Sequence, residues 1–178
     1  SRGLGDVYKR QEMAANDEYR RAFAKDCDRV VKEFDLDGID IDWEYPTSSM
    51  ANISASPDDT ENFTLLMKDI RAAIGDQKEL TLATVASAKY IDFKAILPFI
   101  NFVNIMAYDM ASAPKHHSAL YPSGHSGDIT SDGAVTAHLK AGVPPSKLVM
   151  GMPFYGRGGD GYPSFQDYNK VGNTDTQY

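Results

Sequence analysis

The sequence predicts an α/β fold, a fragment of a (β/α)8 TIM barrel, from two features that run along the chain. Helical and strand patterns alternate, and polar side chains gather where the strand patterns end. Such alternation indicates βαβ units and a parallel sheet. The strands are short and apolar, as expected for a sheet covered on both faces. We expect them at residues 36–43, 80–87, 102–108 and 148–155.

The polar residues at the strand ends distinguish a barrel from a doubly wound sheet, since both fit the alternation. They form three pairs: Asp42 and Glu44, Tyr108 and Asp109, and Tyr155 and Arg157. A barrel collects its active site at the carboxyl ends of its strands. A doubly wound sheet more often carries a glycine-rich phosphate turn, and no Gly-x-Gly-x-x-Gly follows any strand pattern here. Four strand patterns out of eight therefore predict part of a barrel.

Each helix is predicted from its apolar spacing and its end signals. The second helix is expected to begin at Ser56 and to end at Gly75, and further helices are expected at 92–97 and 132–141. The first helix is predicted from a stripe at helical spacing, formed by Tyr19, Phe23, Cys27, Val30, Val31 and Phe34. Cys27 lies on this stripe, so we expect it to be buried as a small apolar side chain.

Residues 12–157 make up the predicted barrel domain. The preceding string, SRGLGDVYKRQ at residues 1–11, resembles a translated sequencing adapter. We expect this segment to be an assembly artefact that is foreign to the fold.

Charge and hydropathy argue against two kinds of partner. The chain of 178 residues carries 18 basic and 25 acidic side chains, a formal net charge of −7. This balance argues against nucleic acid or another polyanion, and it says nothing against a neutral polymer. No apolar stretch reaches the roughly 18 residues that suggest a membrane span.

The segment DGIDIDWEYP, residues 37–46, carries the chemistry. Side chains alternate between the faces of a strand, so Asp40, Asp42 and Glu44 share one face while the apolar residues between them point toward the covering helices. Successive carboxylates on that face lie about 6.6 Å apart along the strand. Three acids this close cannot all ionise cheaply, so we expect one proton to be retained near working pH. A general acid needs such a proton.

These acids allow two other interpretations. A solvated acidic loop would not place apolar residues between its acids. A divalent-metal site would take carboxylate oxygens, but no EF-hand loop is present and one acidic strand supplies few ligands. We expect His116, His117 and His125 to be ordinary polar residues of a distant loop, and His138 to be a partly buried structural residue. The sequence therefore predicts no metal and no cofactor.

The acidic segment resembles the signature of family 18 glycoside hydrolases, Asp-x-x-Asp-x-Asp-x-Glu at the end of the fourth barrel strand. The matching residues are Asp37, Asp40, Asp42 and Glu44, followed by the Trp-Glu-Tyr-Pro form that is typical of chitinases. Residues 106–109, MAYD, and residues 151–157, GMPFYGR, are similar to the motifs of the sixth and seventh strands. The resemblance extends from about residue 19 to residue 157.

The resemblance implies a role for each of Asp40, Asp42 and Glu44, which we call the acid row. Glu44 is the expected proton donor to the glycosidic oxygen. The acetamido group of the substrate is the expected nucleophile, which makes this family an exception to the rule of two carboxylates. Asp42 would orient that group and stabilise the positive intermediate, and Asp40 would share a proton with Asp42.

The resemblance also implies the residues that bind substrate. Tyr108 would hydrogen-bond the acetamido oxygen, with Met106 and Asp109 beside the same sugar. Tyr45, Tyr155 and Arg157 would line the cleft, and Asp37, Gly38 and Trp43 would complete the motif structurally. From the residues alone a core role for Tyr108, with its hydroxyl pointing outward, stays open, as does a structural role for Tyr155 and Arg157.

The function implied is hydrolysis of β-1,4 bonds in chitin or N-acetylglucosamine oligomers by a secreted or cell-surface enzyme. One alternative is a family 18 hydrolase of peptidoglycan or N-glycan cores, although such relatives usually lack Trp-Glu-Tyr-Pro. Another is a non-catalytic chitin-binding lectin, although such lectins typically replace the acid. The resemblance matches the strands to the fourth to seventh of the barrel and makes residues 158–178 the start of a loop or α+β insertion. We expect the chain alone to be inactive, with open sheet edges.

Overall fold

The protein is described by a computed structural model that covers residues 10–50 and 53–157. Its centre is a four-stranded parallel sheet in the order β1-β2-β3-β4. The strands are β1 (Gly38–Ile41), β2 (Glu79–Val85), β3 (Phe102–Met106) and β4 (Leu148–Met150). The helices are α1 (Arg10–Ala15), α2 (Asp17–Glu33), α3 (Asp59–Ile74), α4 (Phe93–Ile96) and α5 (Ser131–Lys140), and a 3-10 turn spans Pro145–Lys147. The predicted α/β alternation and the parallel sheet are confirmed.

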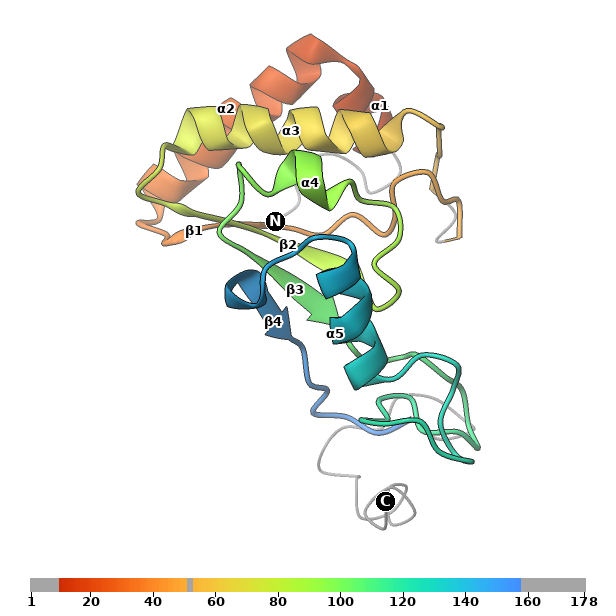
Figure 1. Cartoon of the computed structure of the whole chain (residues 1–178). Helices are drawn as coiled ribbons and strands as arrows, with labels where there is room; N and C mark the ends of the chain where they lie inside the picture. Colours follow the sequence, from red (N-terminus) through yellow and green to blue (C-terminus); the bar gives the residue numbers. More distant parts are fainter. Residues whose placement is uncertain (1–9, 51–52, 158–178) are drawn as a thin grey trace.

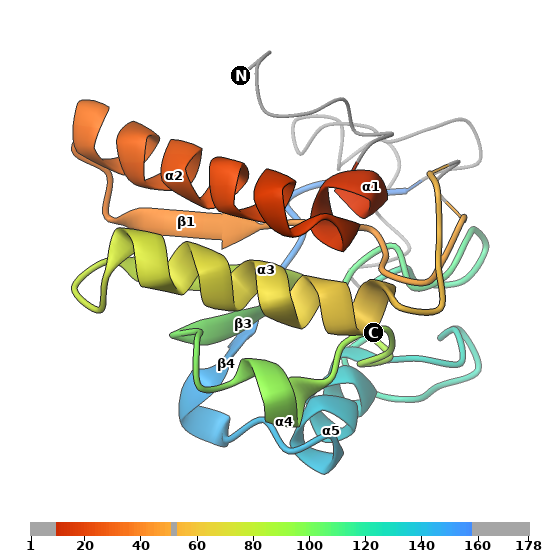
Figure 2. The ribbon, with the colours of Figure 1, turned by 90° about the horizontal axis from the view of Figure 1, so that it is seen from above.

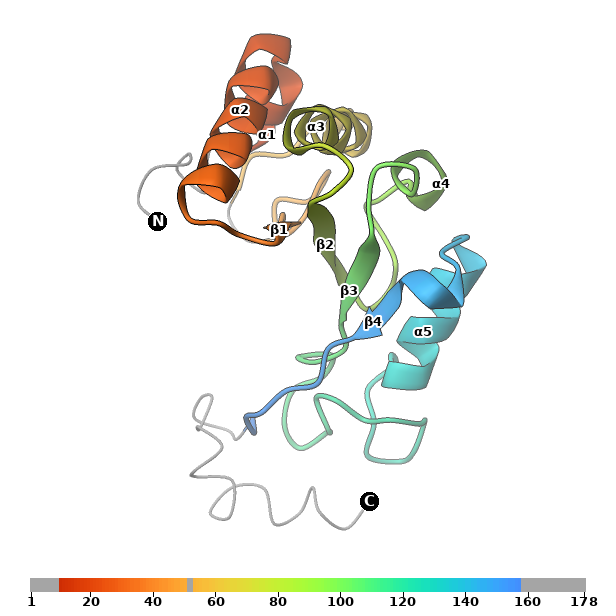
Figure 3. The same ribbon diagram turned by 90° about the vertical axis from the view of Figure 1, so that its left-hand side faces the viewer.

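The helices follow one another along one face of the sheet (Figure 1). Figure 2 shows α2 and α3 running side by side over β1. Figure 3 shows the strands as an arc with α2 to α5 on its outer side. This is the arrangement of successive βα units in a (β/α)8 barrel, so the predicted fold class is confirmed. The inner face of the arc carries the residues that turn away from the helices, among them Asp40.

All four strands are shorter than the sequence predicts, β1 and β4 most of all. β1 spans four residues, and β4 spans three where eight were expected. Among the described residues β4 pairs only with β3, and the last pair of this ladder is Ile105 with Met150. Strand β3 ends at Met106, and Asp109 beyond it adopts φ 56°. Past the ladder, Gly151 N donates to Ile105 O at 2.9 Å.

The buried stripe of α2 differs from the predicted one. Its buried members are Arg20, Ala24, Cys27 and Val31. Tyr19 and Phe34 were expected on the apolar face, but they are 57% and 64% exposed. Tyr19 lies in the first turn and Phe34 lies just past the last, so the face that packs on α3 passes through Arg20 instead.

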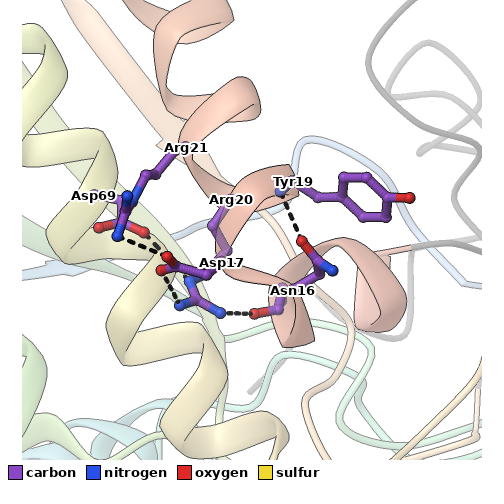
Figure 4. A network of polar contacts seen from close by, with 7 residues as sticks. Asn16, Asp17, Tyr19, Arg20, Arg21 and Asp69 are labelled. Atoms are coloured by element: carbon purple, nitrogen blue, oxygen red, sulfur yellow. Dashed lines mark hydrogen bonds and ion pairs between the residues drawn. The ribbon is translucent and has the colours of Figure 1, made fainter.

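Arg20 is buried because its guanidinium has an acceptor on three sides. It donates to the carbonyl of Ala14 at 2.7 Å, to Asp17 at 3.0 Å and to Asp69 of α3 at 3.2 Å. Figure 4 shows this network, in which Asn16 also caps α2 by accepting from Tyr19 N. A buried charge that is paired in this way ties α1, α2 and α3 together.

Helix α3 begins at Asp59, three residues after the predicted start at Ser56. The carboxylate of Asp59 is fully buried and accepts from Ser56 N at 2.8 Å and from Thr47 N at 3.1 Å. These bonds hold residues 56–58 in a turn outside the helix, and they tie down the loop that follows the acidic segment. The end at Gly75 (φ 75°) is as predicted.

The main core lies between the sheet and the helices. Its fully buried side chains include Phe63, Met67 and Ile70 of α3 and Leu80 and Leu82 of β2. Cys27 belongs to this core at 2% exposure, as predicted, and burial raises the pKa of its thiol to about 12.

His138 of α5 is a structural residue, as expected, and it is fully buried. Its imidazole lies 2.8 Å from Thr84 Oγ1 of β2 and 2.8 Å from the carbonyl of Ala134. Burial lowers the pKa of this histidine, so it stays neutral and links α5 to the sheet.

Among the described residues no helix combines the length and the apolar character that crossing a membrane requires. The segment expected to start an insertion, 158–178, lies outside the described residues. Of the segment expected to be an artefact, only residues 10 and 11 are described, and they lie in α1.

Candidate active site

Asp40 is held on the inner face of the sheet by side chains of β2, the adjacent strand, and β3, the strand after it. Thr81 Oγ1 of β2 donates to Asp40 Oδ1, and Asn104 Nδ2 of β3 donates to the same oxygen at 2.9 Å. The parallel register brings these three side chains together. Asp40 pairs with Thr81 of β2. Asn104 of β3 pairs with Ala83, which lies two residues after Thr81 and therefore on the same face of β2. Neither Thr81 nor Asn104 was identified from the sequence.

Asp42 follows β1 directly and holds a proton more tightly than an ordinary aspartate does. Burial of its carboxyl, followed by the negative charge of Glu44 and a side-chain hydrogen bond with Glu44, raises the pKa of Asp42 to about 6. The charge of Arg10 acts in the opposite direction, and Arg10 Nη1 donates to the backbone carbonyl of Asp42. The acid row therefore retains a proton at mildly acidic pH.

Trp43 sets the direction of its neighbours. It is 3% exposed and packs edge-to-face on Phe63 of α3, with ring centroids 5.7 Å apart. Because side chains in extended backbone alternate, burying Trp43 under α3 turns Asp42 and Glu44 toward the inner face. Glu44 is half-buried there. Asp42 is exposed as a whole residue, although its carboxyl is partly shielded from water.

Tyr45 follows Glu44 in the chain and forms an aromatic pair with Tyr90. Burial and the nearby Glu44 carboxylate raise the pKa of Tyr45 well above its usual range. Its ring stacks on Tyr90, with centroids 5.4 Å apart and planes 16° apart. Tyr90 lies in the segment after β2 and was not predicted as a site residue. Its position just beyond a strand, like that of Tyr108, could have indicated it.

Tyr108 comes from the chain after β3, and it lies within electrostatic reach of the acids. Partial burial and then the charges of Asp42 and Glu44 raise the pKa of Tyr108. The carboxyl ends of β1 and β3 therefore lie close together at one edge of the sheet.

Asp109 is the centre of a second cluster. Tyr155 donates its hydroxyl to Asp109 Oδ1 at 2.9 Å, and Arg157 Nη1 lies 3.5 Å from the same oxygen. Partial burial and this bond raise the pKa of Tyr155. The rings of Tyr108 and Tyr155 meet edge-to-face with centroids 6.3 Å apart. Tyr155 and Arg157 therefore join the site through Asp109.

The expectation that His117 lies in a distant loop is wrong. Its Nδ1 accepts from the backbone N–H of Asp109 at 3.1 Å, and its ring stacks on Tyr155 with centroids 5.2 Å apart. The loop after β3 folds back on the strand end, a contact made by a turn that hydropathy patterns do not reveal.

The remaining motif residues lie at the margin of the acid row. Met106 is half-buried at the end of β3, on the same face as Asn104 by alternation. Asp37 is exposed, and its carbonyl accepts from Glu79 N at 2.9 Å. At Gly38 the backbones of β1 and β2 approach so closely that a Cβ would overlap the carbonyl oxygen of Glu79. Asp37 and Gly38 thus contact β2 through their backbones.

A pocket of about 630 Å³ is lined by neither Asp109 nor the three acids. His117 and Tyr155 form part of its wall, together with loop residues 118–123 and Met150 and Met152. Within residues 10–50 and 53–157, no group of three or more His, Cys, Asp or Glu side chains is arranged to hold a metal ion.

The sequence and the fold of this chain resemble those of known glycoside hydrolases. The profile of the glycosyl hydrolases family 18 matches residues 3–176. Chitinase A1 of Niallia circulans is 35% identical, over 84% of this chain and 25% of that protein. The chitinase domain of the spore coat protein CotE from Clostridium difficile superposes with a TM-score of 0.85 at 36% identity, over 90% of this chain and 50% of that one.

A family 18 N-acetylglucosaminidase from Paenibacillus barengoltzii gives a TM-score of 0.81 at 34% identity, over 90% of this chain and 57% of that one. The chain thus spans between a quarter and somewhat more than half of the length of these three proteins. Since the family profile covers nearly the whole chain, the chain belongs to family 18 of the glycosyl hydrolases.

Proposed function

We propose that this chain carries the catalytic site of an enzyme that hydrolyses β-1,4 bonds in chitin or N-acetylglucosamine oligomers. The observation that carries the proposal is the acid row at the end of β1, where the pKa of Asp42 is raised to about 6 beside Glu44. The similar proteins named above are a chitinase, a chitinase domain and an N-acetylglucosaminidase. Each of them acts, by its name, on this class of polymer or on its residues.

In the proposed reaction Glu44 donates its proton to the glycosidic oxygen, and the bond from that oxygen to the anomeric carbon breaks. The carbonyl oxygen of the substrate's own acetamido group forms a new bond to the anomeric carbon from the opposite face, which gives a cyclic oxazolinium ion. Water then adds to the anomeric carbon, its proton returns to Glu44, and the acetamido group is released. Two inversions at one carbon retain the β configuration.

The other acids support the charged intermediate. Asp42 accepts a hydrogen bond from the acetamido N–H and offsets the positive charge, while a proton is shared along the row. Asp40, held by Thr81 and Asn104, provides the second carboxylate of that proton-sharing pair. The hydroxyl of Tyr108 donates to the acetamido oxygen.

Groups beyond all four strand ends bind the sugar or support the residues that bind it. Tyr45 supplies an aromatic wall, backed by Tyr90. Asp109, held by Tyr155 and Arg157, accepts from sugar hydroxyls on the other side. Since chitin is a polymer outside the cell, we propose that the protein is secreted or displayed at the cell surface.

The test follows the anomeric product and the need for the acetamido group. The protein expressed from its complete gene is incubated with chitin oligomers, and initial products are observed by proton NMR. We expect the β-anomer first and no cleavage of fully deacetylated chitosan. An α-anomer as first product, or equal cleavage of chitosan, would contradict substrate assistance.

Parallel assays on a glycopeptide and on peptidoglycan separate the two alternatives. Preferred cleavage of either substrate over chitin oligomers would identify a different specificity within the family. Binding of chitin oligomers without any cleavage would identify a lectin.

A further inference from the structure

His117 makes contacts that set it apart from the rest of its loop. It is 7% exposed, as is Ser126, whereas His116 is half-buried and Lys115 and His125 are exposed. Its side chain accepts from Asp109 N at 3.1 Å, and its own carbonyl accepts from Met110 N at 2.9 Å. The next residue, Ser118, donates to the carbonyl of Ala107 at 2.7 Å. Three bonds therefore hold the loop against the exit of β3.

The backbone that this loop holds is in a disfavoured conformation. Asp109 has φ 56°, in the left-handed region that residues with a Cβ seldom adopt. Such conformations persist where surrounding contacts over-determine them, and they gather at functional sites. The bond from Asp109 N–H to His117 Nδ1 is one of these contacts.

His117 also acts on the side-chain partner of Asp109. Its ring stacks on Tyr155 with planes 25° apart, and Tyr155 donates to Asp109 Oδ1. His117 Nδ1 also lies 3.4 Å from Asp109 Oδ1 itself. The imidazole thus touches both the backbone and the hydroxyl donor that orient one carboxylate.

We propose that His117 is a positioning residue that sets the direction of the Asp109 carboxylate for sugar binding. The sugar-binding part rests on the proposed function. A carboxylate that binds the sugar equally in the ground state and the transition state changes KM more than kcat when it is misplaced. His117 is therefore a determinant of substrate affinity that does not itself touch the reacting atoms.

A matched pair of variants isolates the acceptor. Asparagine and leucine are close in size, and both remove the ring, but only asparagine offers an oxygen near the position of Nδ1. In the full gene product, His117→Leu should raise KM for a soluble chitin oligomer about tenfold, with kcat within about threefold. His117→Asn should keep KM within about threefold of wild type. His125→Leu, on the exposed part of the same loop, should change neither parameter.

A double-mutant cycle asks whether the effect passes through Asp109. In an Asp109→Asn background, His117→Leu should raise KM by less than about twofold, because the carboxylate to be oriented is gone. An unchanged KM in His117→Leu, equal losses in the asparagine and leucine variants, a loss in kcat alone, or a fully additive cycle would each overturn the proposal. Thermal melting monitors folding, and His117→Ala replaces the leucine variant if that one does not fold.

Amide hydrogen exchange gives a measurement that does not need activity. The N–H of Asp109 should exchange faster in His117→Leu and at close to the wild-type rate in His117→Asn. If wild type hydrolyses no oligomer but exchange follows this pattern, the proposed function fails and the positioning of Asp109 stands. If wild type is active and exchange at Asp109 is the same in all variants, the positioning role fails alone.

Discussion

At the scale of single residues, the proposed catalysis depends on a proton retained among Asp40, Asp42 and Glu44. Asp40 is fixed by two donors, whereas Asp42 has Glu44 and Asp40 as charged neighbours. Like charges this close raise the cost of ionising all three acids. Burial of the Asp42 carboxyl is the largest cause of its raised pKa, and the charge of Glu44 comes next. This shift leads to two predictions.

Glu44→Gln should remove nearly all hydrolysis while leaving oligomer binding largely intact. The amide cannot donate a proton to the leaving oxygen, and general acid catalysis typically contributes about 10²–10⁴-fold. Turnover and calorimetric binding are measured on the full gene product, with Glu61→Gln on the exposed start of α3 as the matched control. Activity within a few-fold of wild type would remove Glu44 from the role of acid.

Asp42→Asn should stabilise the fold above about pH 6 relative to wild type. The pKa of Asp42 rises from 3.8 to about 6, so the folded state favours the protonated form. The stability associated with that proton is fully present below about pH 4 and is lost as pH rises through 6. Asparagine resembles the protonated acid, so the difference in Tm should be near zero at pH 4, grow to pH 6 and then level off. A difference in Tm that does not vary from pH 4 to pH 8 would contradict this account.

At the scale of elements, the site depends on how closely β1 approaches β2. Gly38 permits that approach, and the next residues bring Asp40 opposite Thr81. A change that separates the two strands should therefore disturb both the sheet and the acid row.

Gly38→Ala should lower stability by about 3 kcal/mol, because its Cβ would overlap the backbone of Glu79 and force the strands apart. Gly124→Ala is the matched control, since a Cβ there would meet no atom within 4 Å. Melting curves of both variants in the full gene product measure the effect. Equal Tm values for the two variants would show that β1 and β2 are not held at this distance in solution.

At the scale of the whole described molecule, the sheet ends in two edges. Within residues 10–50 and 53–157, β1 pairs only with β2, and β4 pairs only with β3. Val149 and Met150 of β4 and Met152 and Phe154 after it are exposed. An apolar edge of this kind invites pairing with another chain.

A protein consisting of residues 1–178 alone should therefore self-associate. Sedimentation velocity should show species larger than a monomer, and Met152→Lys should shift the distribution toward monomer. Phe34→Lys is the control, because Phe34 is similarly exposed, at 64% against 67%, but lies at the end of α2 away from this edge. A monomer in both the unchanged chain and the control would contradict the prediction.

The sequence alone determined the α/β alternation, the order of the elements and the acid row. These features are local: the strand period of two and the helical spacing can be read over a few residues. The motifs at the strand ends also identified Asp40, Asp42 and Glu44 as candidates, and residues 106–109 and 151–157 as their neighbours.

Only the tertiary structure decided which side chains meet. Asn104 reaches Asp40 across 64 positions of sequence, and Arg20 reaches Asp69 across 49. His117 accepts from the backbone N–H of Asp109, which has a positive φ after β3. Strand register, helix packing and loop return create these contacts, and none of them leaves a periodic trace in the sequence. Hence Asp40, Asp42 and Glu44 could be identified as candidates from the sequence. Thr81 and Asn104, which bond Asp40, became visible only in the fold, as did Tyr90 beside Tyr45 and His117 beside Asp109.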